Sequence, residues 1–125
     1  MYAFGKRSSE KLATCDERLQ RLMRLAIERS ERDFMVVCGH RGQAEQDAAF
    51  DAGFSRLKFP KGRHNSSPSL AVDVCPYPVD WNDKAGFNYI AGLVKECAKE
   101  LEISVVWGGD WADFVDVPHF QVAKQ

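Results

Sequence analysis

Apolar residues recur along the chain at spacings of three and four, and this spacing predicts two long helices. The first follows Thr14 and Glu17, which match a capping box at a helix N-terminus. The second is expected to begin at Asn82 or Asp83 and to end near Leu101. The apolar stripes are Leu19, Leu22, Met23, Ala26 and Ile27 in the first helix, and Phe87, Ile90, Ala91, Val94 and Ala98 in the second.

Short apolar runs between the helical stretches predict strands. They cover residues 34–38, 70–75, 103–107 and 114–122, the last interrupted by Pro118. A short helix is expected over 44–52, ended by Gly53, and a polar loop over 55–69. Helices and strands in this order predict an α+β fold, with the helices packed on a small sheet.

Length and charge narrow the possible functions. A chain of 125 residues is expected to form a single domain over 1–125. Its net charge of -1 argues against electrostatically driven binding to nucleic acid or to an anionic membrane surface. No apolar run approaches the roughly 20 residues of a membrane-spanning helix, and the N-terminus lacks the apolar core of a signal peptide. We therefore expect synthesis in the cytoplasm and no stable membrane insertion.

The four cysteines occur singly, at Cys15, Cys38, Cys75 and Cys97, without a C-x-x-C pair. This spacing is typical of reduced, mostly buried cysteines that pack as small apolar residues. Cys75 is the one most worth following, because it shares a strand face with Asp73 if the strand is regular.

Asp73 lies at the centre of an apolar strand, between Val72 and Val74. A buried, unpaired carboxylate costs several kcal/mol, so Asp73 should be protonated, hydrogen-bonded or bound to a metal. The alternative is an aspartate that faces solvent on an antiparallel strand. His64 lies in the loop before this strand. Catalytic zinc sites often use two histidines and one carboxylate, with one coordination position of the metal left open. With a second histidine, His64 and Asp73 could therefore form a zinc site.

A second pair of polar residues, Asp116 and His119, lies near the C-terminus. Residues three apart on a regular strand point to opposite faces, so a shared site requires a bend between them. Pro118 favours such a bend, because proline cannot donate to a strand ladder. Asp116 could then act as a base beside the metal. Arg41 lies where a strand passes into a helix, and the role of its neighbour His40 stays open.

The segments that carry chemistry resemble a known family. They are Gly39-His-Arg41, Gln46, the segment 64–73, Trp107-Gly-Gly-Asp-Trp111 and the segment 116–121. In this order they are similar to the D-alanyl-D-alanine peptidase family of zinc enzymes, peptidase family M15. The similarity is greatest to its phage endolysin branch of L-alanyl-D-glutamate peptidases. The resemblance implies an antiparallel sheet, shared with D-alanyl-D-alanine peptidases and the hedgehog domain.

The resemblance also implies roles for individual residues. It makes His64, Asp73 and His119 the ligands of Zn²⁺, Asp116 the catalytic carboxylate, and Arg41 the group that stabilises the oxyanion. Contacts with the substrate are expected from Gln46, His40 and Trp107, and Trp111 is a further aromatic residue for the cleft. Two features depart from the family. Gly42 replaces the usual serine or threonine, and the interval from His64 to Asp73 is longer than in the D,D-peptidases.

The implied function is hydrolysis of an amide bond in the peptidoglycan stem peptide, with the L-alanyl-D-glutamate bond expected. A D-alanyl-D-alanine carboxypeptidase or dipeptidase is the nearest alternative. A zinc-containing binding module without catalysis, as in the hedgehog domain, is a third. The resemblance to endolysins, of phage or prophage origin, further implies an enzyme that stays in the host cytoplasm until a holin releases it to the cell wall. A monomer is expected.

Overall fold

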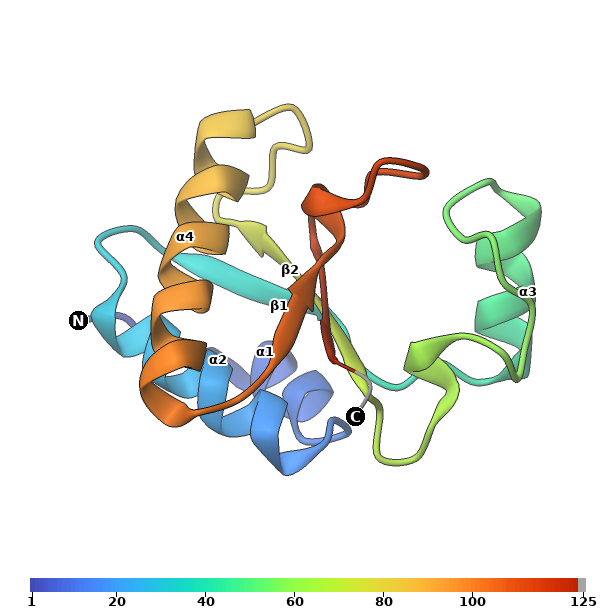
Figure 1. Ribbon diagram of the computed structural model, residues 1–125, viewed down its shortest axis with the longest axis horizontal. Coiled ribbons are helices and arrows are strands. Elements are labelled where there is room, and N and C mark those ends of the chain that lie inside the picture. The colour runs from blue at the N-terminus through green and yellow to red at the C-terminus, as the bar shows by residue number, and fades with distance from the viewer. Residues whose placement is uncertain (124–125) are drawn as a thin grey trace.

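The computed structural model describes residues 1–123. Helices and strands alternate along the chain, and two short 3-10 helices accompany them (Figure 1). The helices are α1 (Lys6–Leu12), α2 (Glu17–Arg29), α3 (Gln43–Asp51) and α4 (Lys84–Leu101), with the 3-10 helices η1 (Arg63–Asn65) and η2 (Gly108–Asp110). The strands are β1 (Phe34–Cys38), β2 (Ala71–Pro76), β3 (Val105–Trp107) and β4 (His119–Val122).

The four strands form one antiparallel sheet in the order β1-β2-β4-β3. The last strand in sequence, β4, therefore lies in the interior of the sheet, beside β2. This order places the segment near the C-terminus next to the middle of the chain. The predicted α+β fold with a small antiparallel sheet is confirmed.

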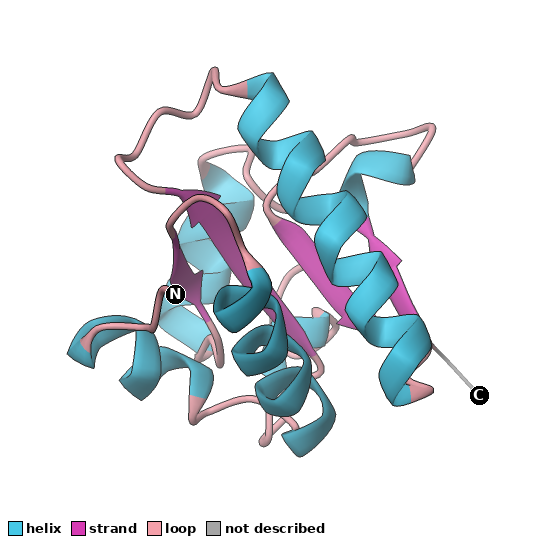
Figure 2. Ribbon diagram, turned by 90° about the vertical axis from the view of Figure 1, so that its left-hand side faces the viewer, coloured by secondary structure: helices cyan, strands magenta, loops and turns pink. Residues whose placement is uncertain are grey.

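Helices α1, α2 and α4 pack on one face of the sheet, and Figure 2 shows helices in front of the strands. Val72 and Val74 belong to the hydrophobic core beneath these helices. Successive side chains on a strand alternate between faces, so Asp73 points to the opposite face. Phe120 and Val122 on β4 likewise join the core, which leaves His119 on the face of Asp73.

Both predicted apolar stripes are buried, those of α2 and of α4. Asp83 caps α4, as expected, by accepting a hydrogen bond from the backbone N–H of Gly86 at 2.9 Å. The predicted cap of α2 is wrong. Asp16 caps this helix, because the Thr14 hydroxyl donates to the Lys11 carbonyl and accepts from the His40 backbone N–H.

The strand predicted over 114–122 is also wrong in its first half, since β4 begins only at His119. Phe114 has a φ of 45°, in the left-handed region, which no regular strand contains. The His119 N–H then donates to the Asp116 carbonyl at 3.2 Å and closes a turn. The bend expected around Pro118 is therefore present, as a turn that precedes the strand.

The described residues contain four free cysteines, of which Cys38 alone is half-buried and the other three are buried. This agrees with the expectation from their spacing. Cys75 lies opposite Met35 in the sheet and is fully buried. Within residues 1–123, no helix has the length and apolar character needed to cross a membrane.

Candidate functional site

The ladder of the sheet brings three residues of the site into one row. Asp73 on β2 is paired with His119 on β4, and on its other side with Cys38 at the end of β1. The register of β1 shifts between Val36 and Cys38, which marks a bulge. Side chains directly opposite each other on one face lie close together, so this row assembles a polar cluster from three strands.

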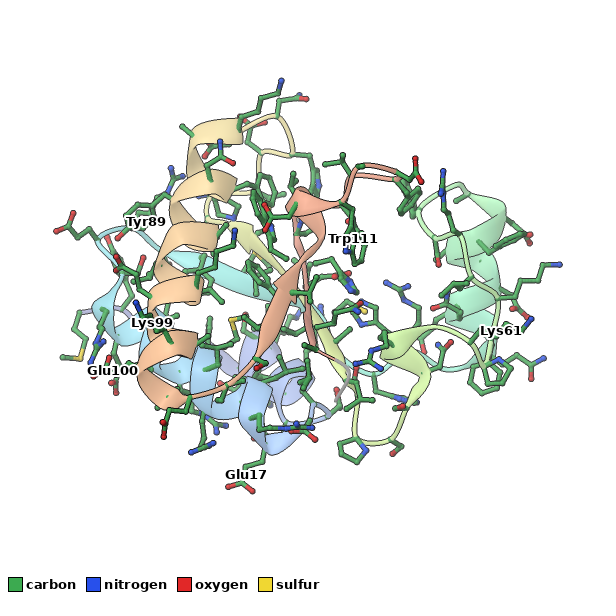
Figure 3. All side chains as sticks on the ribbon, viewed as in Figure 1. Glu17, Lys61, Tyr89, Lys99, Glu100 and Trp111 are labelled. Carbon is green, nitrogen blue, oxygen red and sulfur yellow. The ribbon has the colours of Figure 1, made fainter. Side chains whose placement is uncertain are left out.

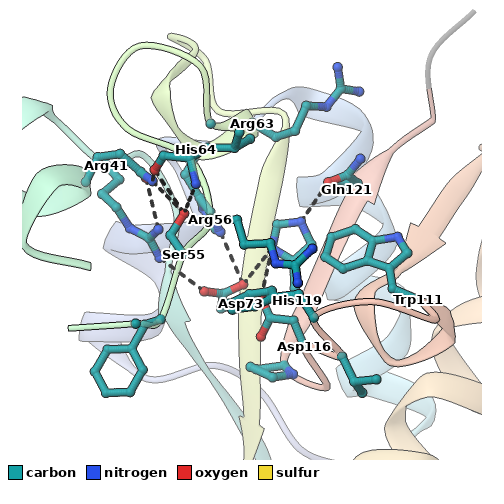
Figure 4. Close-up of a pocket in the computed structure, with 18 of the residues that line it drawn as sticks. Arg41, Ser55, Arg56, Arg63, His64, Asp73, Trp111, Asp116, His119 and Gln121 are labelled. Carbon is teal, nitrogen blue, oxygen red and sulfur yellow. Dashed lines mark hydrogen bonds and ion pairs between the residues drawn. The ribbon is translucent and has the colours of Figure 1, made fainter. Parts of the chain in front are cut away.

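Asp73 lies at the centre of the cluster, between two imidazole rings (Figure 4). Its Oδ1 atom is 3.2 Å from His64 Nε2 and 3.1 Å from His119 Nδ1. The two rings meet edge to face, with their centroids 5.1 Å apart. The side chains of all three are largely removed from solvent, with exposed fractions of 13% for Asp73, 5% for His64 and 8% for His119.

The remaining nitrogen of each imidazole is held by an acceptor. His64 Nδ1 lies 2.8 Å from the Gly39 carbonyl, and His119 Nε2 lies 2.8 Å from Gln121 Oε1. An N–H on each of these atoms leaves the nitrogen that faces Asp73 without a proton in the neutral ring. Metal-binding histidines are oriented in this way in proteins. Two such nitrogens and a carboxylate oxygen therefore form a donor set that fits zinc.

Without a metal, the cluster is a charged hydrogen-bonded group. Burial alone would lower the pKa of His64, but its interactions with Asp73 and Cys38 outweigh burial and raise this pKa to about 10. Burial likewise opposes ionisation of Asp73, yet hydrogen bonds from His119 and His64 hold its pKa well below the usual range. The carboxylate is thus charged at neutral pH, and positive charge faces it.

Asp116 reaches the same side through the turn before β4. Its Oδ2 atom lies 3.9 Å from His119 Nδ1, beyond hydrogen-bond distance. Burial, and after it the negative charge of Asp73, raises the pKa of the Asp116 carboxyl. Gly108 permits this approach, because a Cβ atom there would lie 2.3 Å from the Asp116 carbonyl oxygen. The result is a second carboxylate beside the ligand set that is better able to accept a proton.

Arg41 approaches the cluster from the segment between β1 and α3. Its Nη2 atom lies 3.5 Å from Asp73 Oδ2, and its Nη1 donates to Gln46 Oε1 at 3.0 Å. Gln46 is almost fully buried, and its Nε2 donates to Ser55 Oγ and to the Leu57 carbonyl. Its amide thus fixes the guanidinium.

A pocket of about 950 Å³ opens over these residues, between the sheet and the α3 side of the molecule. Trp111 lines it and packs against His119, with ring centroids 5.1 Å apart (Figure 3). Trp107 instead donates from Nε1 to the Val117 carbonyl at 2.7 Å, and His40 Nδ1 is bound to the Ser66 carbonyl at 2.9 Å. Trp107 is thus turned away from the pocket, which Trp111 and Trp81 line.

Cys38 is the site residue that the sequence did not reveal. Its Sγ atom lies 3.6 Å from Arg41 Nη2 and 3.9 Å from His64 Nδ1. Together with His64 and Asp73 it forms one of the clusters that could hold a metal ion, while Asp73, Asp116 and His119 form another. Only the position of Cys38 at the end of an apolar strand, next to Gly39, pointed to this place.

Comparison with known proteins identifies the family of the chain. The model of the phage L-alanyl-D-glutamate peptidase family matches residues 1–121. The chain belongs to this family. The L-alanyl-D-glutamate peptidase of Escherichia phage T5 is 37% identical over 114 residues, covering 88% of this chain and 82% of the relative. The crystal structure of Serratia marcescens L-Ala D-Glu endopeptidase ChiX superposes with a TM-score of 0.84 at 35% identity, covering 97% of this chain and 90% of that one.

Membership of the phage L-alanyl-D-glutamate peptidase family confirms three expectations from the sequence. The chain is an enzyme, it is a peptidase, and its class is the endolysin-like one implied by the resemblance. The D,D-peptidase alternative gains no support from these relatives. These relatives do not assign the residues of the site, its metal or its substrate contacts. Those assignments rest on the geometry described above.

Proposed function

We propose that this family member is a zinc-dependent endopeptidase that cleaves the L-alanyl-D-glutamate bond of the peptidoglycan stem peptide. One observation carries the proposal. The Asp73 carboxylate faces two imidazole nitrogens, from His64 and His119, while the other nitrogen of each ring is committed to Gly39 or Gln121. This arrangement supports His64 Nε2, Asp73 and His119 Nδ1 as the residues that hold the ion.

A bound zinc ion supplies Lewis-acid activation of water and of the scissile carbonyl. Asp116, whose pKa is raised by burial and by Asp73, takes the proton of the attacking water and delivers it to the leaving amine. Arg41 donates hydrogen bonds to the oxygen on which negative charge develops. Its guanidinium is held ready for this by Gln46 and does not need to be reorganised during the reaction.

The pocket suits a charged peptide, since aromatic and charged side chains line it. Trp111, beside His119, is the proposed platform for the peptide, while Gln46 acts on the substrate through Arg41. Direct substrate contacts from His40 and Trp107 would require each side chain to give up its hydrogen bond to the Ser66 or the Val117 carbonyl. Action on the cell wall after release from a host cytoplasm, as a monomer, completes the proposed role.

Two variants test the assigned roles. Asp116→Asn should retain one zinc per chain and lose hydrolysis, because the amide cannot accept the proton of water. His64→Ala should lose zinc. Asp110→Asn is a matched control, since Asp110 pairs with Lys95 on the surface at 2.7 Å. Normal turnover by Asp116→Asn would refute the role of this carboxylate, and full zinc content in His64→Ala would remove this residue from the ligand set.

The bond preference is tested by digesting purified peptidoglycan and identifying the new amino termini by mass spectrometry. Cleavage of the L-alanyl-D-glutamate bond exposes the amine of D-glutamate. A D,D-carboxypeptidase or dipeptidase would instead release D-alanine or its dipeptide. Absence of the D-glutamate amine would reject the endopeptidase proposal.

A further inference from the structure

Arg56 is a charged residue of the pocket for which the reaction above has no use. It lies in the loop after α3, lines the pocket with an exposed side chain, and in Figure 4 extends toward the site. Its guanidinium carbon lies 5.5 Å from the centroid of the Phe114 ring, which belongs to the loop before β4. The pair joins two loops that are separate in sequence, across the rim of the pocket.

The charges of the pocket distinguish Arg56 from the other two arginines that line it. Arg41 is paired with Asp73 and bound to Gln46. Arg63 donates to the carbonyl of Val122 and so ties η1 to β4. Within residues 1–123, no carboxylate forms an ion pair with Arg56. An aromatic ring covers one face of a guanidinium, but its N–H groups lie in the plane and stay available for an anion.

Phe114 is held in an unusual conformation. Its φ of 45° lies in the left-handed region, which is rare for a bulky residue. Such conformations persist only where the surrounding structure imposes them, and they concentrate at functional sites. Here the conformation places the Phe114 ring beside Arg56, and this contact orients the guanidinium at the rim of the pocket.

The proposed substrate carries an anion close to the bond that is cleaved. A D-glutamyl residue has two carboxyl groups, and only one can form the amide bond to the next residue of the peptide. The other remains a free carboxylate, a few bonds from the scissile nitrogen. We propose that Arg56 binds this free carboxylate and so selects stem peptides with glutamate over those in which this group is a carboxamide. The inference rests on the proposed L-alanyl-D-glutamate cleavage.

Two synthetic peptides test the inference with the zinc-loaded enzyme. They share the L-alanyl-D-glutamyl bond and differ only in whether the second carboxyl is free or a carboxamide. A hydrogen-bonded charge pair is lost with the carboxamide, so kcat/KM should be about tenfold or more higher for the carboxylate peptide. Arg56→Gln should lower kcat/KM about tenfold for the carboxylate peptide only and abolish the preference. Arg56→Lys, which keeps the charge without the two-pronged geometry, should fall between.

Arg24→Gln is the matched control, because Arg24 lies on α2, donates to Gln20 Oε1 at 3.3 Å and does not line the pocket. It should leave both rates unchanged, and Arg56→Gln should keep the wild-type unfolding temperature, since its side chain is exposed. Equal losses for the two peptides in Arg56→Gln, or an unchanged preference, would overturn the inference. A preference abolished by Arg63→Gln and not by Arg56→Gln would also overturn it. If the wild-type enzyme cleaves neither peptide, the proposed bond specificity itself fails.

Discussion

Gln46 gives the sharpest test of how Arg41 is held. Gln46→Met keeps the volume of the side chain and removes its hydrogen bonds. Arg41 Nη1 then loses its 3.0 Å acceptor, and a hydrogen bond to a charged group contributes about 1.5–3 kcal/mol. Two other hydrogen-bond partners of Gln46 keep a second bond in this variant. Asn65 Nδ2 also donates to the Arg41 carbonyl, and the Leu57 carbonyl also accepts from Ser55 Oγ.

We therefore expect Gln46→Met to lower the free energy of unfolding by about 1.5–3 kcal/mol, measured by urea denaturation of the metal-free protein. Loss of an entire oxyanion donor costs about 10²–10³ in kcat. A displaced Arg41 should still stabilise the oxyanion in part, so kcat should fall about ten- to a hundredfold with little change in KM. Arg41→Met, which removes the donor entirely, sets the upper limit of the loss in kcat.

The two roles considered for Gln46 predict different kinetics. If Gln46 contacts the substrate directly and equally in the ground and transition states, Gln46→Met raises KM and leaves kcat unchanged. If it positions Arg41, kcat falls. Gln20→Met serves as a control, since Gln20 donates to the Cys15 carbonyl at 2.9 Å from α2 and has no contact with the pocket. An unchanged kcat in Gln46→Met would refute the positioning role.

Three further predictions concern the ligand set. Cys38→Ala should keep one zinc per chain, because the thiol lies 3.9 Å from Nδ1 of His64, the nitrogen that is bound to the Gly39 carbonyl; zinc lost from this variant would make sulfur a ligand. With its pKa at about 10, His64 is protonated at pH 7 in the metal-free protein. Zinc binding must therefore release a proton, and zinc affinity must rise with pH up to about 10. Equal calorimetric heats of zinc binding in buffers of different ionisation enthalpy would contradict this. Gly108→Ala should displace Asp116 and reduce kcat at least tenfold with zinc retained, and normal kcat would refute the need for this close approach.

The spacing of apolar residues predicted the helices that pack on the core through a single apolar face. The stripes of α2 and α4 are buried as predicted, because apolar residues at helical spacing have one way to leave water. Helix α1 escaped detection, since only Ser8 and Leu12 of its seven residues are buried. The strand predicted from residue 114 failed because apolar residues do not reveal the positive φ of Phe114.

The site was predictable in its residue types and only partly in its geometry. Asp73 between two valines signalled a carboxylate that needs partners, the two histidines His64 and His119 were candidates for them, and the family resemblance assigned all three as ligands. Cys38 could not be found, because its place depends on the bulge in β1 and on the pairing of β1 with β2. Pairing between distant segments, and the orientation of each imidazole, are set by the folded backbone and leave no local pattern in the sequence.

A zinc titration tests the central claim most directly. The enzyme is stripped of metal with a chelator, and zinc is added in steps while the peptide with a new D-glutamate amino terminus is quantified by mass spectrometry. We predict no product without zinc and a linear rise that levels off at one equivalent per chain. Full hydrolysis by the metal-free enzyme, or no D-glutamate product at any zinc concentration, would contradict it.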